Sequence, residues 1–370
     1  MDTTHLVNRF NSPSPLVVLD SLLPTRFLLG AKDGSSHRYV LNLEPEVRTV
    51  SLLEGESRLL QYLSEFAADQ ASYDFKSHFL LPLILREKTS LLPCLTDLPT
   101  GRNWTLRHFV DGVNFDWRRS GWDVQHCFTA GTALAALHNL SYLEGFLSDF
   151  PPDALPHEVD YLKICETGLE KALMRSQDGL GDLRSSLDRC RELLAKSLPY
   201  TNVGNPILIH GDWHPGNVMF SKPSSVSDMP PIRALGAIDW DYARRGDRVF
   251  DLAYALYMFA GTFRGGKDCG GELFFKDFAE HFIKGYRQIQ CELIAAENSK
   301  LTVEALEQRL TIVLTLILLF ELEQRKSDAE TNVTEANIEG LLTLLLSSGE
   351  KDKPIKHGAV FMKAILDGIL

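Results

Sequence analysis

Two short polar segments of this chain carry residue types that could do chemistry. The first, His-Gly-Asp-Trp-His-Pro-Gly-Asn, spans residues 210–217 and follows the apolar run 207–209. The second, Ile-Asp-Trp-Asp, spans residues 238–241 and ends an apolar stretch. Polar side chains on loops at strand ends belong to functional sites more often than to cores. We therefore take these two segments as the candidate site.

The two segments suit phosphoryl transfer to an alcohol. That reaction needs a carboxylate that accepts the hydroxyl proton and oxygen ligands that hold Mg²⁺ at the phosphates. Asp212 is the candidate base, while the side-chain oxygens of Asn217 and Asp239 are candidate magnesium ligands, because Mg²⁺ takes few protein ligands and keeps several waters. For Asp241, three roles stay open: orienting these ligands, holding a second metal ion, or capping the backbone.

An alternative interpretation treats the first segment as a metal site. His210, Asp212 and His214 alternate along the chain, and alternate residues of an extended strand point the same way. Three such ligands with an open position would make a metal-dependent hydrolase. The Pro-Gly turn that follows, and Asn217 beyond it, fit phosphoryl transfer better.

Both segments resemble the aminoglycoside phosphotransferase and choline kinase superfamily, the protein-kinase-like small-molecule kinases. In that family, His-Gly-Asp-x-x-x-x-Asn forms the catalytic loop, and the Ile-Asp strand replaces the protein-kinase Asp-Phe-Gly element. The resemblance implies an α+β, two-lobe protein-kinase-like fold, with a small antiparallel-sheet lobe over residues 1–108 and a larger, mainly helical lobe over residues 109–370. It also implies ATP and Mg²⁺ as cofactors. The acceptor would be a small-molecule hydroxyl on an amino alcohol, sugar, amino sugar or aminoglycoside.

The resemblance assigns roles residue by residue. Asp212 becomes the general base, Asn217 and Asp239 become magnesium ligands, and His210 shapes the loop. Asp251, the acidic residue before Leu-Ala, would brace the catalytic loop; without the family, we would expect it only to cap the next helix.

The first lobe departs from the kinase pattern at one position. Kinase-like folds pair a basic residue on the third strand with a glutamate on the adjoining helix. Glu56 fits the helix position, but the strand pattern reaches Asn42 where a basic residue usually stands. Arg26, Lys32 and Arg38 are open as substitutes. We expect Glu56, Arg38 and Asn42 at the nucleotide. The neutral Asn42 also motivates a second function, a regulatory nucleotide-binding pseudokinase.

Hydrophobic patterns predict the elements that must position these residues. Short apolar runs bounded by turns predict strands at residues 16–19, 26–29, 38–43, 78–85 and 104–110, and a one-sided pattern predicts a helix at 50–66. The rest is predicted to be mostly helical, at residues 127–139, 161–174, 183–198, 252–259, 274–292, 303–326 and 335–346. Strands at 206–210 and 232–239 lead into the two polar segments.

Composition excludes several classes of protein. The net charge of −11 argues against a duplex-DNA binder, which needs a basic face. The longest apolar run, residues 310–320, is shorter than the roughly 20 residues of a membrane span. The six cysteines show no paired C-x-x-C spacing, and residues 1–5 lack the charged and apolar start of a secretory signal. We expect a cytoplasmic protein with no nucleic-acid or membrane partner; the oligomeric state stays open.

Overall fold

The computed structural model describes most of the chain in two compact units. The described residues are 6–23, 25–69, 80–97, 100–116, 121–143, 145–148, 160–175, 181–196, 206–222, 232–261, 275–288, 302–324, 338, 341–342 and 345. The first unit comprises Met1–Asn114, Glu144–Pro156 and Asn217–Arg244, and the second comprises Phe115–Leu143, His157–Gly216 and Arg245–Leu370. The lobe boundary that we predict between residues 108 and 109 stays a prediction.

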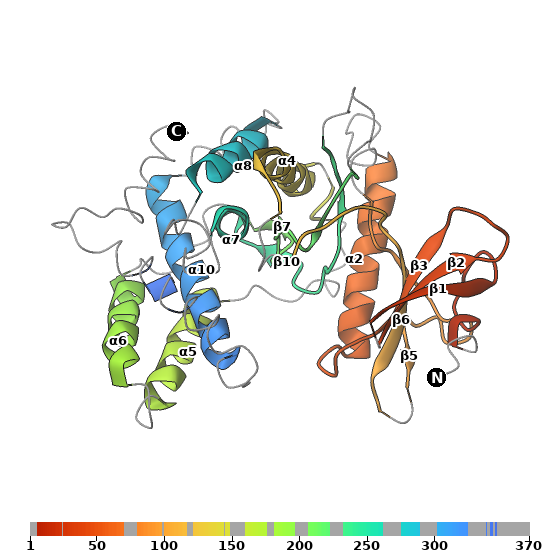
Figure 1. The fold of residues 1–370 in the computed structure, drawn as a ribbon, viewed down its shortest axis with the longest axis horizontal. Coiled ribbons are helices and arrows are strands. Elements are labelled where there is room, and N and C mark those ends of the chain that lie inside the picture. Colours follow the sequence, from red (N-terminus) through yellow and green to blue (C-terminus); the bar gives the residue numbers. More distant parts are fainter. Residues whose placement is uncertain are drawn as a thin grey trace. The chain divides into compact units, whose positions relative to one another are not determined.

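The first unit is built on an antiparallel sheet (Figure 1). Its strands are β1 (Leu16–Leu23), β2 (Arg26–Ala31), β3 (Arg38–Leu43), β4 (Ile84–Leu85), β5 (Leu95–Thr96) and β6 (Asn103–His108), in the order β1-β2-β3-β6-β4 with β5 paired to β6. The three strands predicted near the N-terminus are confirmed. The strand predicted at 78–85 is too long: among its described residues only 84–85 form a strand, and residues 78–79 lie outside the described residues.

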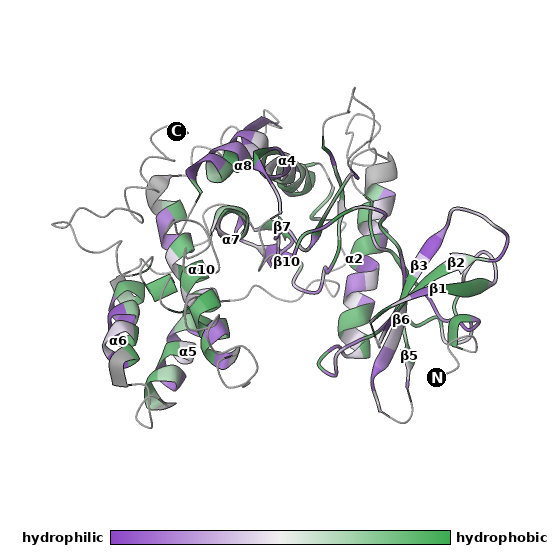
Figure 2. Cartoon of the chain, viewed as in Figure 1, coloured by the Kyte–Doolittle hydropathy of each residue, from purple (hydrophilic) through white to green (hydrophobic). Residues whose placement is uncertain are grey.

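The two faces of this sheet differ in chemistry because side chains alternate along each strand. Tyr39 and Leu41 of β3 point into a buried apolar cluster with Trp104 and Leu106 of β6. The opposite face meets the predicted helix, α2 (Val50–Asp69), through a salt bridge between Arg107 and α2. Figure 2 shows hydrophobic and hydrophilic residues mixed along α2, as a helix with one buried face requires.

A two-stranded antiparallel ribbon completes the first unit. It consists of β8 (Val218–Phe220) and β9 (Ala234–Ala237). All three residues of β8 are buried. Because this ribbon immediately follows Asn217 and leads to Asp239, its register decides how those two residues lie.

The second unit is mainly helical (Figure 1). Its described helices are α4 (Val124–Leu140), α5 (Tyr161–Arg175), α6 (Gly181–Lys196), α7 (Arg248–Ala260), α8 (Lys276–Gln288) and α10 (Val303–Gln324). A short strand, β7 (Ile207–Ile209), pairs with β10 (Arg244–Gly246), whose last two residues belong to this unit. These six helices confirm six of the seven predictions; the last predicted helix, 335–346, lies mostly outside the described residues.

Two glycines bring α4 and α8 into close contact. A Cβ atom on Gly131 would lie 2.0 Å from the carbonyl oxygen of Phe282, and one on Gly285 would lie 1.9 Å from that of Phe128. Real Cβ atoms do not approach oxygen so closely, so glycine at both positions lets the two backbones touch. This contact matters to the site because α4 and α8 each supply one residue to the network behind the candidate catalytic loop.

The apolar run 310–320 lies within α10. Among the described residues, no helix combines the length and the apolar content that crossing a membrane requires.

Candidate active site

The segment that carries Asp212 begins where β7 ends. The three residues of β7 are buried, and the chain then turns at Gly211, whose φ of 80° lies in the left-handed region that favours glycine. His210 is fully buried, and its Nδ1 accepts a hydrogen bond of 3.3 Å from the backbone amide of Asp212. His210 therefore shapes the loop from within.

The carboxylate of Asp212 contacts the side chains of Tyr254 and His214. The hydroxyl of Tyr254, from α7, donates to Oδ1 at 2.5 Å, and Nε2 of His214 lies 3.5 Å from Oδ2. Burial raises the pKa of Asp212, but the contacts with His214 and Tyr254 lower it by more, so the pKa lies below its usual value. The carboxylate is thus ionised at neutral pH, as a proton acceptor must be at the start of a reaction.

Asp251 braces the backbone just before Asp212. Its fully buried carboxylate accepts hydrogen bonds of 3.0 Å from the amides of both His210 and Gly211. Burial raises the pKa of Asp251, but the hydrogen bonds from the His138 ring and the Gly211 amide hold the pKa below its usual value. The capping role that we expect without the family is wrong, because α7 begins earlier: Asp247 caps it by accepting from the amide of Val249 at 2.8 Å.

A series of buried hydrogen bonds between side chains holds Asp251 in place. Nε2 of His138, from α4, lies 3.0 Å from Asp251, and its Nδ1 lies 2.7 Å from the hydroxyl of Tyr286, from α8. That hydroxyl accepts from Nε of Arg248 at 2.7 Å. Burial keeps the pKa of His138 below its usual value, so the neutral ring donates to Asp251 and accepts from Tyr286. Sequence reasoning missed these three residues, because helical periodicity indicates burial but not polar partners.

Asp251→Ala is expected to lower the free energy of unfolding by about 3 kcal/mol at pH 7, because it leaves several buried donors unpaired. The folded pKa lies below the unfolded value of about 3.9, so the carboxylate stabilises the fold above that pH. The stabilisation is lost as the pH falls through the folded pKa. Denaturant titrations should show that the difference in free energy of unfolding between wild type and variant is smaller at pH 3 than at pH 7.

A suitable control is Asp188→Ala, which removes an exposed ion pair with Arg191 and is expected to change stability by no more than about 0.5 kcal/mol. If the difference in free energy of unfolding between wild type and Asp251→Ala does not change with pH, the stabilising role of the ionised carboxylate is contradicted.

Asn217 and Asp239 lie at the same end of the β8–β9 ribbon. Val218 pairs with Ala237, and the amide of Ile238 donates to the carbonyl oxygen of Asn217 at 2.9 Å. Asp239 follows directly, with a φ of 63° that non-glycine residues rarely adopt. Such strain persists only where the surroundings impose it, and it concentrates at functional sites. One amide oxygen and one carboxylate at this end are a donor set that fits Mg²⁺.

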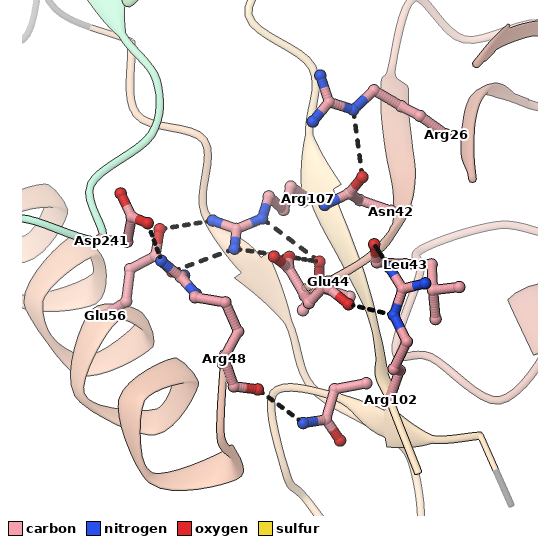
Figure 3. A network of polar contacts seen from close by, with 11 residues as sticks. Arg26, Asn42, Leu43, Glu44, Arg48, Glu56, Arg102, Arg107 and Asp241 are labelled. Atoms are coloured by element: carbon pink, nitrogen blue, oxygen red, sulfur yellow. Dashed lines mark hydrogen bonds and ion pairs between the residues drawn. The ribbon is translucent and has the colours of Figure 1, made fainter. Parts of the chain in front are cut away.

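The candidate helix glutamate is part of a buried polar network in the first unit (Figure 3). Glu56 of α2 pairs with Nη1 of Arg107 at 2.6 Å and also with Arg48. Nη2 of Arg107 lies 3.0 Å from Oε1 of Glu44, the residue after β3. Burial lowers the pKa of Arg107, but Glu56 and Glu44 raise it by more, and Arg107 and Thr105 likewise hold the pKa of Glu44 down. Arg107 and Glu44 are therefore both charged at neutral pH.

The basic partners of Glu56 are thus Arg107 and Arg48, which sequence reasoning missed. Arg107 lies on β6 opposite Val40 of β3, so a neighbouring strand supplies the cation that the neutral Asn42 of β3 cannot supply. In β6, the polar residues Thr105 and Arg107 alternate with apolar residues, and this pattern indicates that one face of the strand is polar. It did not indicate which helix that face meets.

Arg38 and Asn42 lie outside this network. The half-buried Arg38 pairs with Asp111, which also pairs with Lys222 at 2.8 Å. Asn42 accepts from Nε of Arg26 at 3.2 Å across the β2–β3 pair (Figure 3). Of the three residues predicted at the nucleotide, only Glu56 is therefore in the buried network, and the nucleotide contacts of all three stay predictions.

The hydrolase alternative gains no support from the loop. Nδ1 of His214 accepts from the amide of Gly216 at 2.9 Å, and Nδ1 of His210 is occupied by the amide of Asp212. Within the described ranges, no group of three or more His, Cys, Asp or Glu side chains is arranged to hold a metal ion. Both histidines instead shape the loop through hydrogen bonds to its backbone.

The fold is shared with solved structures of low sequence identity. An aminoglycoside phosphotransferase from Alicyclobacillus acidocaldarius matches with a TM-score of 0.55 at 14% identity, over 95% of this chain and 91% of that one. A microcompartment-associated aminopropanol kinase matches with a TM-score of 0.55 at 18% identity, over 94% and 96% of the two chains. Aminoglycoside 2'-phosphotransferase-IIIa matches with a TM-score of 0.54 at 16% identity, over 92% and 99%.

These matches confirm the expected α+β, protein-kinase-like fold. No match was found among curated protein sequences. The model of one family, described as the phosphotransferase enzyme family, matches residues 18–290, which include both polar segments. With most of its length matched, and with the loop and ribbon described above inside the match, the chain belongs to the phosphotransferase enzyme family.

Proposed function

We propose that this protein is a small-molecule kinase that transfers the γ-phosphoryl group of ATP to an alcohol, with Mg²⁺ as cofactor. The observation that carries the proposal is that the family match contains Asp212, Asn217 and Asp239 within the two segments that resemble the family's catalytic loop and its Ile-Asp strand. Nucleotide use is supported by a structural neighbour, a spectinomycin phosphotransferase crystallised with ADP and spectinomycin, with a TM-score of 0.51. Another neighbour is a GDP complex, so GTP is also a donor worth testing.

In this proposal Asp212 accepts the proton of the acceptor hydroxyl as its oxygen attacks the γ-phosphorus. The P–O bond to the β-phosphate breaks, and the nucleoside diphosphate leaves. Tyr254 orients the carboxylate through Oδ1, and the lowered pKa of Asp212 keeps it deprotonated before the reaction. His210 and Asp251 fix the backbone that carries it.

Asn217 and Asp239 would hold the metal through their side-chain oxygens. When bound, Mg²⁺ would neutralise charge on the bridging phosphate oxygens. The position of both residues at one end of the β8–β9 ribbon supports this assignment. The ribbon supplies a rigid base, because its strands are hydrogen-bonded and β8 is buried.

The acceptor is proposed to be an amino alcohol, a sugar, an amino sugar or an aminoglycoside. The test is to incubate the protein with Mg²⁺ and either ATP or GTP, adding each acceptor class in turn, and to detect the phosphomonoester by ³¹P NMR. We expect product from one class only. If no class gives product and Mg-ATP binding is absent by calorimetry, the proposal is wrong.

A second candidate function is nucleotide binding without turnover, as in a pseudokinase. Its support is the neutral Asn42 on β3 and the engagement of both Arg48 and Arg107 by carboxylates. Slow ATP turnover separates the two functions. Equal rates in wild type and Asp212→Ala would eliminate the kinase and favour the second candidate.

Tyr254→Phe is expected to move the acidic limb of the pH profile of kcat/KM to higher pH. The hydroxyl of Tyr254 is one of the groups that lower the pKa of Asp212, so its removal raises that pKa. Initial rates between pH 4 and 9 would measure the shift. Tyr62→Phe, which removes a hydrogen bond of 2.7 Å to the carbonyl of Phe146, is the matched control and should leave the limb in place. A limb that stays in place in Tyr254→Phe would contradict this role.

A further inference from the structure

One arginine joins α2 to the segment that follows Asp239 (Figure 3). Arg48, in the turn between β3 and α2, pairs with Glu56 of α2 through Nη2 and with Oδ2 of Asp241 through Nη1 at 2.8 Å. Arg48 and Glu56 are both buried. A single guanidinium thus connects the helix beside the sheet to a residue two positions beyond the candidate metal ligand.

Arg48 is itself firmly held. Its amide donates to the carbonyl oxygen of Pro45 at 3.0 Å, and its own carbonyl accepts from Nδ2 of Asn103, on β6, at 2.9 Å. Its partner Glu56 is fixed by Arg107. Because Asn103 lies on β6 and Glu56 lies on α2, these contacts fix the guanidinium that pairs with Asp241.

The backbone between these anchors is the strained part of the segment. Asp239 has a φ of 63°, a conformation that must be imposed from outside. On its N-terminal side, the amide of Ile238 is bonded to Asn217. The next residue, Trp240, is buried, and its Nε1 donates to the carbonyl of Ala237 at 2.9 Å. The ion pair with Arg48 holds the segment at Asp241, so Asp239 is clamped from both sides.

The balance of charge shows why Arg48 is needed to hold Asp241, and with it the segment after Asp239, in place. The ion pairs described above join three carboxylates, Glu44, Glu56 and Asp241, to the guanidiniums of Arg48 and Arg107. Without Arg48, these ion pairs of the described residues would retain one guanidinium, that of Arg107, for three carboxylates. Asp241 would then lose its cation and be repelled by Glu56. The segment would be driven away from α2, and the constraint on Asp239 would be lost.

We propose that Arg48 is a positioning residue that holds Asp239 in its metal-binding conformation by linking Glu56 to Asp241. The inference rests on the proposed function, in which Asp239 is a magnesium ligand. Arg48 itself touches neither metal nor nucleotide in this proposal. Its effect should therefore appear in metal affinity and not in the affinity for the nucleotide alone.

The test measures Mn²⁺ binding directly. The electron paramagnetic resonance signal of free Mn²⁺ is followed while protein and a non-hydrolysable ATP analogue are added. We expect Arg48→Gln to weaken Mn²⁺ binding in this complex by about 10-fold, which is typical when a residue supporting a metal ligand is lost. The affinity for the analogue without metal, measured by calorimetry, should change by less than about 2-fold.

Two further variants make the test specific. Asp241→Asn breaks the same link while leaving the pair of Arg48 and Glu56 intact, so it carries the test if Arg48→Gln does not fold. The double variant should be no weaker than either single one, because both remove one interaction. Arg86→Gln, which breaks another Arg–Glu pair on α2, with Glu54, is the control and should bind Mn²⁺ like wild type.

The outcomes separate the two proposals. If both Arg48→Gln and Asp241→Asn bind Mn²⁺ as tightly as wild type, the role of Arg48 is overturned and the proposed function stands. The same follows if the losses of Mn²⁺ affinity in the two single variants multiply in the double variant. If wild type binds no Mn²⁺ with the analogue, the proposed function is overturned and this inference falls with it.

Discussion

Asp212→Asn is expected to lower kcat by about 10³-fold while leaving Mg-ATP binding within about 2-fold of wild type. Removal of a general base typically costs 10²–10⁴-fold, since the hydroxyl must then lose its proton to water. Asparagine keeps the shape and can still accept from Tyr254, so the change isolates proton acceptance from loop structure. Steady-state rates with the identified acceptor, and calorimetry with Mg-ATP, would measure the two quantities.

Asp188→Asn provides the matched control, because it neutralises an exposed carboxylate on α6 and should leave kcat unchanged. A kcat within tenfold of wild type in Asp212→Asn would exclude Asp212 as the base. Loss of Mg-ATP binding in that variant would instead indicate that Asp212 acts on the nucleotide.

Asp239→Asn is expected to lower kcat by about 10³-fold and to raise the Mg²⁺ concentration needed for half-maximal rate. Stabilisation of transition-state charge by a metal is worth several kcal/mol, and each 1.36 kcal/mol is tenfold in rate. Asparagine tolerates the left-handed conformation of this position, whereas alanine would be strained there. The asparagine variant therefore removes charge without forcing the backbone to move. Rates measured across Mg²⁺ concentrations would give both values.

The control for Asp239→Asn is Asp33→Asn, in the exposed turn between β2 and β3, where the carboxylate accepts a hydrogen bond of 2.9 Å from the amide of Ser35. We expect this variant to behave as wild type. If Asp239→Asn keeps the wild-type dependence on Mg²⁺, another residue holds the metal and the assignment of Asp239 is wrong.

Much of the fold and part of the candidate site were predictable because they depend on neighbours in the sequence. β3 begins and ends at the predicted residues, and α2 begins where its apolar pattern starts. Strand and helix periods are local properties, so the sequence reveals them directly. The spacing of Asp212 and Asn217 is also local, since one loop carries both, and the resemblance to phosphotransferases followed from these few positions.

The tertiary structure alone decided which charges meet. The sequence leaves Arg26, Lys32 and Arg38 open as partners for Glu56, yet Arg107, 51 residues away on β6, takes that place with Arg48. Asp251 likewise finds its partners in His138 and in a backbone 40 residues earlier. A period in the sequence shows which face of an element is buried. The partner that the face meets depends on strand register and helix packing, which only the folded chain defines.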